Sequence, residues 1–436
     1  MNLSELLARF IAHGCTTVYV KPMAANDNSK NQIYFGPGFD AVNLFPNHGI
    51  KADHERKNFK AAIQFLWMDP DGTLVDAPGA QLILYPQYPE VRFSGFLRGA
   101  NTALADRLNR RIDGRTLLLG VTHDGRTIGH VVLSDEAEAH RFIGLADDIY
   151  GVFHALDALR LTGQVNTRQQ LINALRAVHE RSWIDSKQLR SDGRIDACNA
   201  PQCGGFTLEA ELGISKNSKA EPDFLGYEVK QHQVTSFDRP ASGSAITLMT
   251  PEPKSGYYGS EGVVAFIRRF GYPDKVGRED RWNFGGIHKV GQAHATTGLT
   301  LKLTGYDAAA GKITDMDGAV ALYTAEDEMA AGWSFKELLH HWTKKHAKAV
   351  YVPSMARTEP RRQYAYGHTV RIADQTDFIK LLSAFNTGMV YYDPGIKLEH
   401  ASSDKPKEKR RSQFRIHSKD IGALYRTVDQ VRLTDG

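Results

Sequence analysis

The chain has 436 residues, of which 42% are hydrophobic and 24% are charged. This length predicts two or three domains with full apolar cores, and no stretch approaches the ~20 apolar residues of a membrane-spanning helix. The formal net charge of +4 neither predicts nor excludes nucleic-acid binding, so that question falls to local clusters of basic residues.

Cysteine usage and the first residues predict a cytoplasmic protein. Cys15, Cys198 and Cys203 are too few for a disulfide framework, and the last two lack partners at zinc-ligand spacing. The N-terminal sequence MNLSELLARFIAHG is typical of an amphipathic helix. It has no basic start, long apolar run or small-residue cleavage site, so it does not have the pattern of a secretory signal peptide. We therefore expect a reducing, cytoplasmic location and no membrane partner.

Residues 1–135 consist of short apolar segments separated by Gly, Pro, Asn and Asp, a pattern typical of a β-rich fold. The segments include TTVYVKP, NQIYFG, AAIQFLWMD, AQLILYPQ, RTLLLGVTHDG and TIGHVVLS. Many short strands joined by turns predict a barrel or pseudobarrel domain. Residues 136–164 have few Gly or Pro and predict a helical linker to a second domain over residues 165–436.

The segment VYVKPMAANDNSKNQIYFG (Val18–Gly36) combines basic and amide side chains that suit a loop lying on DNA. Lysine pairs with phosphate, while Asn and Gln can donate to and accept from one base edge. The same residue types are also favoured in an ordinary turn. The predicted DNA contacts of this segment are Lys21, Asn26, Asn28, Lys30, Asn31 and Gln32.

The Lys-x-x-x-Ala-Asn-Asp pattern in this segment resembles the N-terminal effector domain of EcoRII, a B3-like DNA-binding pseudobarrel. This resemblance implies a DNA-recognition domain at the N-terminus. The residues from Asn28 to Gln32 replace a Gly- and Thr-rich loop of that domain, so its sequence preference is not implied here.

The segment LYPQYPEVRFSGFLRG (Leu84–Gly99) brings tyrosines and prolines close to two arginines. An apolar wall beside an arginine suits a backbone phosphate with a less polar oxygen, such as a phosphorothioate, because such a lining disfavours a hydrated oxyanion. Core packing plus one phosphate-binding arginine explains the same residues. The predicted contacts are Tyr85, Pro86, Tyr88, Arg92 and Arg98.

The run PDFLGYEVK (Pro222–Lys230) has the spacing that metal-dependent phosphodiester hydrolysis requires. Glu228 and Lys230 leave the same face of a β-strand, and Asp223 can reach the same point if the chain bends at Gly226. Two carboxylates can hold Mg²⁺, and a lysine can activate water and offset phosphate charge. The same residues are also common on any solvated hairpin.

Upstream, GGFTLEAELGI predicts a helix with Thr207 at its N-cap and a carboxylate near its positive end. Glu209 and Glu211 both compete for the role of the helical carboxylate. A helical Glu followed by Asp-x4-Glu-x-Lys is a much rarer combination than the run alone.

The segments TLEAELGI, PDFLG and EVK, with Asn217, together resemble the MvaI/BcnI group of restriction endonucleases, whose core is similar to the mismatch-repair nicking enzyme MutH. The resemblance extends over residues 165–436. It implies an α/β PD-(D/E)XK nuclease core with flanking helices, Mg²⁺ as cofactor and double-stranded DNA as partner. It also implies a catalytic set, with the three carboxylates as metal ligands: Glu209, Asp223, Glu228 and Lys230.

The basic C-terminal region supplies candidate DNA contacts for this second domain. Ser402–Gln413 predicts an exposed loop, and Arg and Gln suit bidentate contacts with guanine and adenine edges. A purely solvating charged loop is the alternative. Lys344 and Lys345 are named only as backbone contacts. The predicted base-reading residues are Arg410, Arg411, Gln413, Arg415 and His417.

Three functions are compatible with these residues. The first is a Mg²⁺-dependent restriction endonuclease that hydrolyses double-stranded DNA at a specific site. The second cuts only when the N-terminal domain senses a mark such as a phosphorothioate, with a cognate DNA-modification system as partner. The third is a catalytically silent DNA-binding protein. A monomer and a homodimer both fit the sequence.

Overall fold

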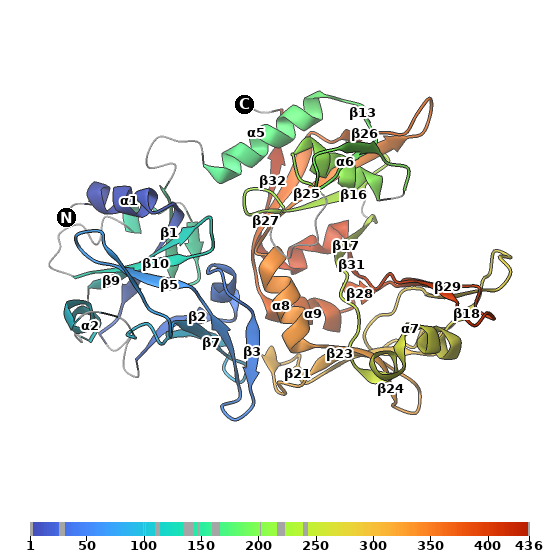
Figure 1. Cartoon of the computed structure of the whole chain (residues 1–436), viewed down its shortest axis with the longest axis horizontal. Coiled ribbons are helices and arrows are strands. Elements are labelled where there is room, and N and C mark those ends of the chain that lie inside the picture. Colours follow the sequence, from blue (N-terminus) through green and yellow to red (C-terminus); the bar gives the residue numbers. More distant parts are fainter. Residues whose placement is uncertain are drawn as a thin grey trace. The chain divides into compact units, whose positions relative to one another are not determined.

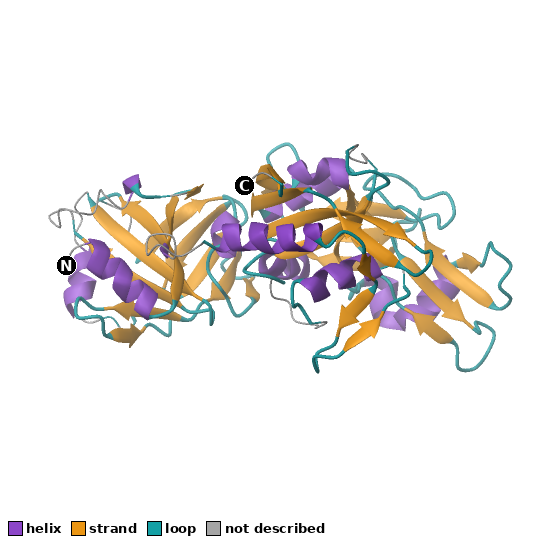
Figure 2. Cartoon of the chain, turned by 90° about the horizontal axis from the view of Figure 1, so that it is seen from above, coloured by secondary structure: helices purple, strands orange, loops and turns teal. Residues whose placement is uncertain are grey.

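The computed structural model describes residues 3–25, 31–98, 100, 102–109, 114–133, 143–146, 148–158, 166–200, 202–215, 223–238 and 243–434. The chain divides into two compact units, Met1–Gln170 and Leu171–Gly436. Figure 1 traces the elements of each unit, and Figure 2 shows that strands dominate the first unit while the second mixes helices and strands. No helix within the ranges given above is long and apolar enough to cross a membrane.

The first unit is built from two β-sheets. One sheet has the strand order β11-β12-β1-β9-β10-β5-β6 and the other has the order β2-β8-β7-β4-β3. The elements of this unit are α1 (Leu3–Ala12), β1 (Cys15–Met23), β2 (Gln32–Pro37), η1 (Asp40–Asn43), β3 (Ile50–Asp53), β4 (Asn58–Ala62), β5 (Phe65–Met68), β6 (Leu74–Asp76), β7 (Gln81–Tyr85), β8 (Glu90–Ser94), α2 (Thr102–Asn109), β9 (Arg115–Thr122), β10 (Thr127–Val132), β11 (Asp148–Tyr150) and β12 (Phe153–Asp157). The prediction of a β-rich N-terminal region is confirmed, while its B3-like character stays a prediction.

Aromatic side chains join the two sheets of the first unit into one core. The ring centroids of Phe35 and Phe153 are 4.9 Å apart, and those of Phe65 and Phe93 are also 4.9 Å apart. Each pair links a residue of one sheet to a residue of the other. Such contacts add to the stabilisation from burying the rings, by roughly 0.5–1.5 kcal/mol per pair.

The prediction of a helical linker over residues 136–164 is wrong for the segment that forms β11 and β12. β11 and β12 form an antiparallel hairpin around Gly151, whose φ is 60°. β12 then pairs with β1, from Thr17 opposite Asp157 to Val20 opposite His154. A single glycine in a short turn was enough to reverse the chain, so the scarcity of Gly and Pro did not indicate a helix. The two units meet in sequence within α5 (Thr167–Glu180).

The second unit is organised around a mixed sheet with the strand order β13-β26-β25-β27-β32, in which β16 runs parallel to β25. Its helices, besides α5, are α6 (Cys203–Glu211), α7 (Gly256–Phe270), α8 (Phe335–Lys345) and α9 (Phe378–Asn386), with the 3-10 helix η2 (Ser418–Ala423). Strands of the mixed sheet are β13 (Ile184–Asp185), β16 (Glu228–Gln233), β25 (Lys348–Arg357), β26 (Gln363–Tyr366), β27 (Thr369–Thr376) and β32 (Tyr425–Arg432). The mixed α/β fold that the sequence predicts is confirmed.

Smaller sheets make up the rest of the second unit, with orders β17-β31-β28, β18-β19-β29-β30, β20-β23-β24, β14-β15 and β21-β22. Their strands are β14 (Lys187–Leu189), β15 (Ile195–Ala197), β17 (Ala245–Met249), β18 (Tyr272–Pro273), β19 (Arg281–Gly285), β20 (Thr300–Thr304), β21 (Tyr306–Asp307), β22 (Lys312–Ile313), β23 (Ala319–Tyr323), β24 (Met329–Ser334), β28 (Val390–Tyr392), β29 (Gly395–Glu399), β30 (Lys407–Lys409) and β31 (Phe414–His417). β30 lies within the segment for which the sequence predicts an exposed loop.

Helices α5 and α6 pack on one face of the mixed sheet and fix the position of β16. Leu171 and Leu175 of α5, Leu208 of α6 and Val229 of β16 belong to one buried cluster. The two leucines of α5 are four residues apart and therefore lie on one helix face. Because side chains alternate along a strand, burying Val229 in this core sends Glu228 and Lys230 to the opposite face.

Helix α8 carries a further lysine to the same region of the second unit. The helix begins with a capping box, in which Ser334 and Glu337 exchange side-chain and backbone hydrogen bonds. In the same helix, Trp342 is fully buried and its Nε1 donates to Thr376 Oγ1 at 3.1 Å. These contacts fix the end of α8, where Lys345 is the last residue.

Candidate active site

A tight turn brings Asp223 next to the start of β16. Phe224 and Tyr227 exchange backbone hydrogen bonds of 3.0 and 2.8 Å. Gly226 between them has φ 84°, a conformation that glycine adopts without steric cost. Asp223 Oδ2 accepts a hydrogen bond of 3.0 Å from the backbone N–H of Val229. The predicted bend is confirmed, and it holds Asp223 beside the strand that carries the other residues.

Glu228 is almost completely buried, and each of its oxygens has a lysine near it. The side chain is 2% exposed, and Lys230 Nζ donates to its Oε1 at 2.6 Å. Lys345 Nζ lies 3.8 Å from its Oε2, which is buried and accepts no hydrogen bond from the described residues. Two ammonium groups therefore offset the charge of one buried carboxylate, and one of its oxygens stays available to a further ligand.

Glu209 approaches this group from the second half of α6. The helix begins at Cys203, so the prediction that Thr207 is its N-cap is wrong. Thr207 is instead buried in the helix, and its Oγ1 accepts from the backbone N–H of Lys187 at 3.1 Å. Cys203 and the two glycines after it form the first turn of the helix. Glu209 therefore lies near the C-terminal end of the helix.

Electrostatic coupling shows that the predicted catalytic residues lie together. Burial, together with the neighbouring charges of Asp223 and Glu228, raises the pKa of Glu209 to about 7, against the opposing effect of Lys230 and Lys345. Burial also raises the pKa of Glu228, against the same two lysines. Perturbed carboxylates of this kind are characteristic of functional sites. The sequence prediction of one shared site is consistent with this geometry.

Glu211, the competing helical carboxylate, serves a different contact. It forms ion pairs with Arg181 and Lys187, the latter at 2.5 Å between Lys187 Nζ and Glu211 Oε1. These pairs connect α6 to β14 and to the residue that follows α5, so Glu211 is already paired with two cations. The structure therefore favours Glu209 as the helical carboxylate of the site.

The donor chemistry of the site fits a hard divalent cation. Carboxylate oxygens are the ligands that Mg²⁺ prefers, and the unpartnered Oε2 of Glu228 is a buried acceptor that lacks a hydrogen. As the side chains stand, no three His, Cys, Asp or Glu groups in the described part of the chain are close enough together to hold a metal ion. The residues that could hold one are Asp223, Glu228 and Glu209.

Lys345 and His346 are the neighbours of this site that the sequence did not assign to it. His346 is 1% exposed, and its ring stacks on Trp342 with centroids 4.3 Å apart. Burial, aided by the charges of Lys230 and Lys345, holds the pKa of His346 well below its usual value. A neutral imidazole therefore lies under the two lysines. More than a hundred residues separate α8 from β16, so spacing along the chain could not reveal this neighbour.

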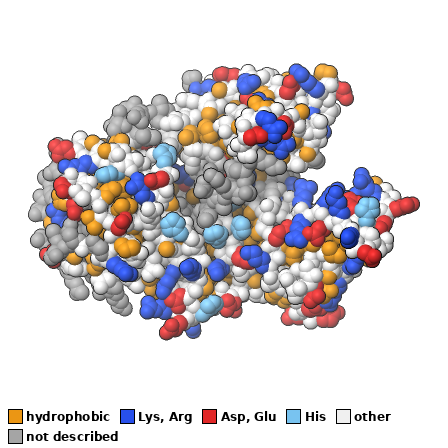
Figure 3. All heavy atoms as spheres, viewed as in Figure 1, with side chains coloured by type: hydrophobic (Ala, Val, Ile, Leu, Met, Phe, Trp, Pro, Cys, Tyr) orange, Lys and Arg blue, Asp and Glu red, His pale blue; other side chains and the backbone are white. Residues whose placement is uncertain are grey.

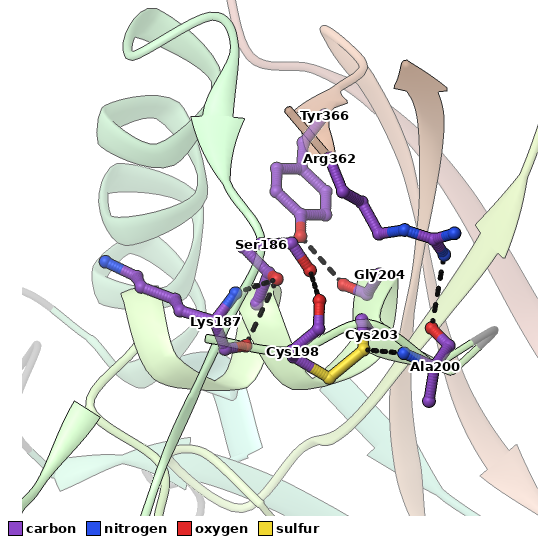
Figure 4. The surroundings of a disulfide bond; sticks show 9 residues. Ser186, Lys187, Cys198, Ala200, Cys203, Gly204, Arg362 and Tyr366 are labelled. Atoms are coloured by element: carbon purple, nitrogen blue, oxygen red, sulfur yellow. Dashed lines mark hydrogen bonds between the residues drawn. A yellow bond between two sulfur atoms is a disulfide. The ribbon is translucent and has the colours of Figure 1, made fainter. Parts of the chain in front are cut away.

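A disulfide bond, shown in Figure 4, anchors the start of α6. Cys198 and Cys203 are bonded with Cα atoms 5.8 Å apart, which corrects the expectation that the three cysteines form none. The carbonyl of Cys198 accepts from Ser186 Oγ at 2.5 Å, and Tyr366 donates to the carbonyl of Gly204 at 2.7 Å. The chain turns back between β15 and α6 and brings two cysteines five positions apart together.

The predicted DNA contacts of the first unit differ in how exposed their side chains are. Lys21 is 4% exposed and donates to the carbonyl of Pro22 at 3.1 Å, so its ammonium lies inside the unit rather than on the surface as predicted. Asn31 is exposed with φ 52°, and Gln32 Nε2 donates to Tyr85 Oη at 3.4 Å. Asn26, Asn28 and Lys30 lie outside the described residues.

The predicted aromatic wall of the first unit is not continuous. Pro86 is buried, whereas Tyr88 is 71% exposed at the turn between β7 and β8. Arg92 pairs with Glu90 at 2.8 Å, so one of the two predicted arginines already has a carboxylate partner. Arg98 is exposed. Phosphorothioate sensing by these residues stays a prediction.

The predicted base-reading residues near the C-terminus are largely committed to internal contacts. Gln413 is 5% exposed and Arg415 forms an ion pair of 2.6 Å with Asp393. His417 lies 3.2 Å from the carbonyl of Gly243 through its Nδ1. Arg410 and Arg411 remain exposed, although Arg410 pairs with Glu408 at 2.6 Å. The residue types favour base contacts, but several of these side chains already contact other residues of the protein around β30 and β31.

Comparisons with protein families and with solved structures find restriction endonucleases that are similar to this chain. The model of the MvaI/BcnI restriction endonuclease family matches residues 172–425, which is more than half of the chain. A solved complex of restriction endonuclease MvaI with its cognate DNA substrate has 18% sequence identity and a TM-score of 0.46, covering 62% of this chain and 100% of that chain. A structure of restriction endonuclease MvaI without DNA has 16% identity and a TM-score of 0.34, covering 62% and 98% of the respective chains.

No curated protein sequence matches the chain. The family match spans α6, the turn at Asp223, β16 and α8, so it includes every residue of the candidate site. The chain belongs to the MvaI/BcnI restriction endonuclease family and is a site-specific DNA endonuclease.

Proposed function

We propose that this endonuclease hydrolyses phosphodiester bonds of double-stranded DNA in a Mg²⁺-dependent reaction, with the ion held by Asp223 and Glu228. The observation that carries the proposal is the unpartnered, buried Oε2 of Glu228, which lies among coupled charges from three separate elements. Lys345 offsets part of the charge at 3.8 Å but donates no hydrogen bond, so this buried oxygen keeps an unfilled acceptor position that a bound cation would occupy. When bound, Mg²⁺ supplies Lewis acidity toward the attacking water and the departing 3′ oxygen.

Lys230 has the position and the donors to act on the nucleophile. Its ammonium has three N–H groups, and one of them donates to Glu228 Oε1. The remaining donors can orient the attacking water and offset the charge that develops on the phosphate. Lys230 is partly exposed whereas Glu228 is buried, so its free donors face the side from which DNA can enter.

Glu209 is suited to accept a proton or to orient water. Because its pKa is raised to about 7, its carboxyl group exchanges protons near neutral pH. Lys345 adds a second positive charge beside Glu228 and favours the ionised form of both glutamates. We assign Lys345 to charge balance in the site and Glu209 to water orientation or to a second ion.

The surface of the second unit supports DNA binding next to this site. Figure 3 shows that surface hollowed between the part that carries α6 and β26 and the arm that carries β18, β29 and α7, with Lys and Arg side chains gathered on the arm. Basic side chains along a hollow favour DNA by neutralising phosphates and releasing counterions. We assign a second DNA-reading role to the first unit, on its exposed Asn31 and Tyr88 and its partly exposed Gln32.

Cleavage of a supercoiled plasmid tests the proposal. The wild-type protein is expected to cut at fixed positions in Mg²⁺ and to leave 5′-phosphate ends, whereas excess chelator stops cleavage without stopping DNA binding. End mapping of the products and a binding assay in chelator give the two readouts. Equal cleavage with Mg²⁺ and with chelator would overturn the metal assignment.

A further inference from the structure

A basic pocket lies beyond the end of β16, outside the candidate active site. It has a volume of about 370 Å³ and is lined by Gln233, Ala356, Arg357, Thr358, Arg362 and Tyr364. Gln233 is the last residue of β16, three positions after Lys230, which is about 10 Å at roughly 3.3 Å per strand residue. The β25–β26 hairpin supplies the rest of the lining. The pocket is therefore attached to the strand that carries the catalytic lysine.

Arg357 is held in place with its outer edge free. Its guanidinium carbon lies 4.5 Å from the ring centroid of Trp183, and its Nε donates to Gln363 Oε1 at 2.6 Å. Gln363 is fixed in turn, because its Nε2 donates to Asp185 Oδ1 at 2.7 Å. Holding a guanidinium by its stem and one face leaves the Nη edge to make a forked contact with an anion.

Arg362 lines the pocket from the turn directly before β26. One of its Nη atoms donates to the carbonyl of Ala200 at 3.4 Å, as Figure 4 shows, and no other contact of its guanidinium is found among the described residues. Asp185, the nearby acid, is already paired with the neighbouring Arg361 at 2.8 Å. Within the described chain, neither Arg357 nor Arg362 has a carboxylate within ion-pair distance.

Among the described residues, the pocket therefore carries two positive charges that have no carboxylate within ion-pair distance. Its other polar side chains, Gln233 and Thr358, can also donate hydrogen bonds. Phosphodiester oxygens accept hydrogen bonds and carry the missing negative charge, and arginine forks match their geometry. We propose that Arg357 and Arg362 form a binding site for one backbone phosphate of the DNA that lies across the active site. This inference rests on the proposed function and adds a substrate contact to it.

Binding measurements on the full-length protein in metal-free buffer test the site. The variant with both Arg357→Gln and Arg362→Gln is compared with Arg361→Gln, which removes an adjacent arginine that already has a partner. The probes are a random-sequence duplex and a duplex that spans a mapped cleavage position. We expect the double variant to bind both duplexes about tenfold more weakly, with its log–log salt dependence reduced by about one.

Affinity and salt dependence equal to those of Arg361→Gln would overturn the proposal. A loss confined to the site-bearing duplex would also overturn it, because the pocket would then read a base. If the double variant unfolds, the single Arg362→Gln variant, which loses one long hydrogen bond, gives the same comparison. A wild-type protein that binds with the expected salt dependence but cuts no DNA would defeat the proposed function, while the binding comparison would still support the pocket.

A neutral methylphosphonate placed at one backbone position at a time gives an independent check. The wild-type protein should lose affinity most at one position near the cut, and the double variant should be insensitive at that position. Equal position profiles for the two proteins would contradict a phosphate contact in this pocket.

Discussion

Lys345 Nζ lies 3.8 Å from Oε2 of Glu228, so a helix more than a hundred residues away in sequence supplies a cation to the buried carboxylate of β16. This contact explains how the chain keeps a charge in a nearly dry position before any metal binds. It also separates two roles for lysine in the site, because Lys230 donates to Oε1 while Lys345 remains beyond hydrogen-bond distance of Oε2.

Replacing Lys345 with Ala should weaken cleavage through charge rather than through lost structure. The lysine lowers the pKa of both Glu209 and Glu228, so its removal favours their protonated forms. We expect cleavage at neutral pH to fall by about tenfold and the acid limb of the pH–rate profile to move to higher pH. Lys336→Ala, an exposed lysine of the same helix, is the matched control. An unchanged pH profile in the Lys345 variant would contradict the role.

Glu209 should make the metal-free protein less stable as pH rises. Its folded pKa of about 7 lies above the ordinary glutamate value of 4.5, so the folded state binds more protons than the unfolded state between these values. The contribution of Glu209 to stability is therefore greatest below about pH 4.5 and is lost as the pH rises to about 7. Glu209→Gln should be more stable than wild type at pH 8, by on the order of 1 kcal/mol, and nearly equal at pH 4. Urea unfolding in chelator measures the free energy of unfolding of both proteins at both pH values. An equal stability difference at pH 4 and at pH 8 would refute the raised pKa of Glu209.

The Cys198–Cys203 bond should stabilise the start of α6. Closing a loop this short is expected to contribute about 2 kcal/mol by restricting the unfolded chain. Reductant or Cys198→Ser should lower the melting temperature, with reductant having no further effect on the variant. Unfolded, unreduced protein should expose one reactive thiol, that of Cys15. Finding three thiols would show that the bond is absent.

Cleavage should not require a chemical mark on the DNA. The arginine of β8 that would contact a modified phosphate is already paired with Glu90, which weakens the case for a dedicated modification sensor. Plasmids prepared from hosts with and without backbone or base modification should both be cut, when the protein is incubated with each in Mg²⁺. Cutting of the modified plasmid alone would identify the enzyme as modification-dependent instead.

The catalytic run could be predicted from sequence because its geometry is local. Side-chain alternation places Glu228 and Lys230 on one strand face, and Gly226 permits the bend that brings Asp223 beside them. The N-cap of α6 was mispredicted because Thr207 has the right chemistry for a cap but is taken up by a contact with Lys187 of β14. Local propensity cannot reveal a partner that only the tertiary fold supplies.

Long-range contacts account for the other differences. Lys21 and Gln413 have surface-like chemistry, yet both are buried, Lys21 within β1 and Gln413 directly before β31. The hairpin of β11 and β12 depends on the free edge of β1, which a count of Gly and Pro does not register. The basic pocket at Arg357 and Arg362 required the β25–β26 hairpin and the end of β16 to be placed together.

The most direct test of the catalytic assignment is plasmid cleavage by Lys230→Ala in Mg²⁺, followed beside DNA binding by the same protein. Removing the ammonium that we place beside the nucleophile should lower the cleavage rate by at least about a thousandfold, while affinity for DNA stays near that of wild type. Asp223→Ala should lose cleavage and also the Mg²⁺-dependent gain in thermal stability. Cleavage by Lys230→Ala as fast as by the wild-type enzyme would contradict the account.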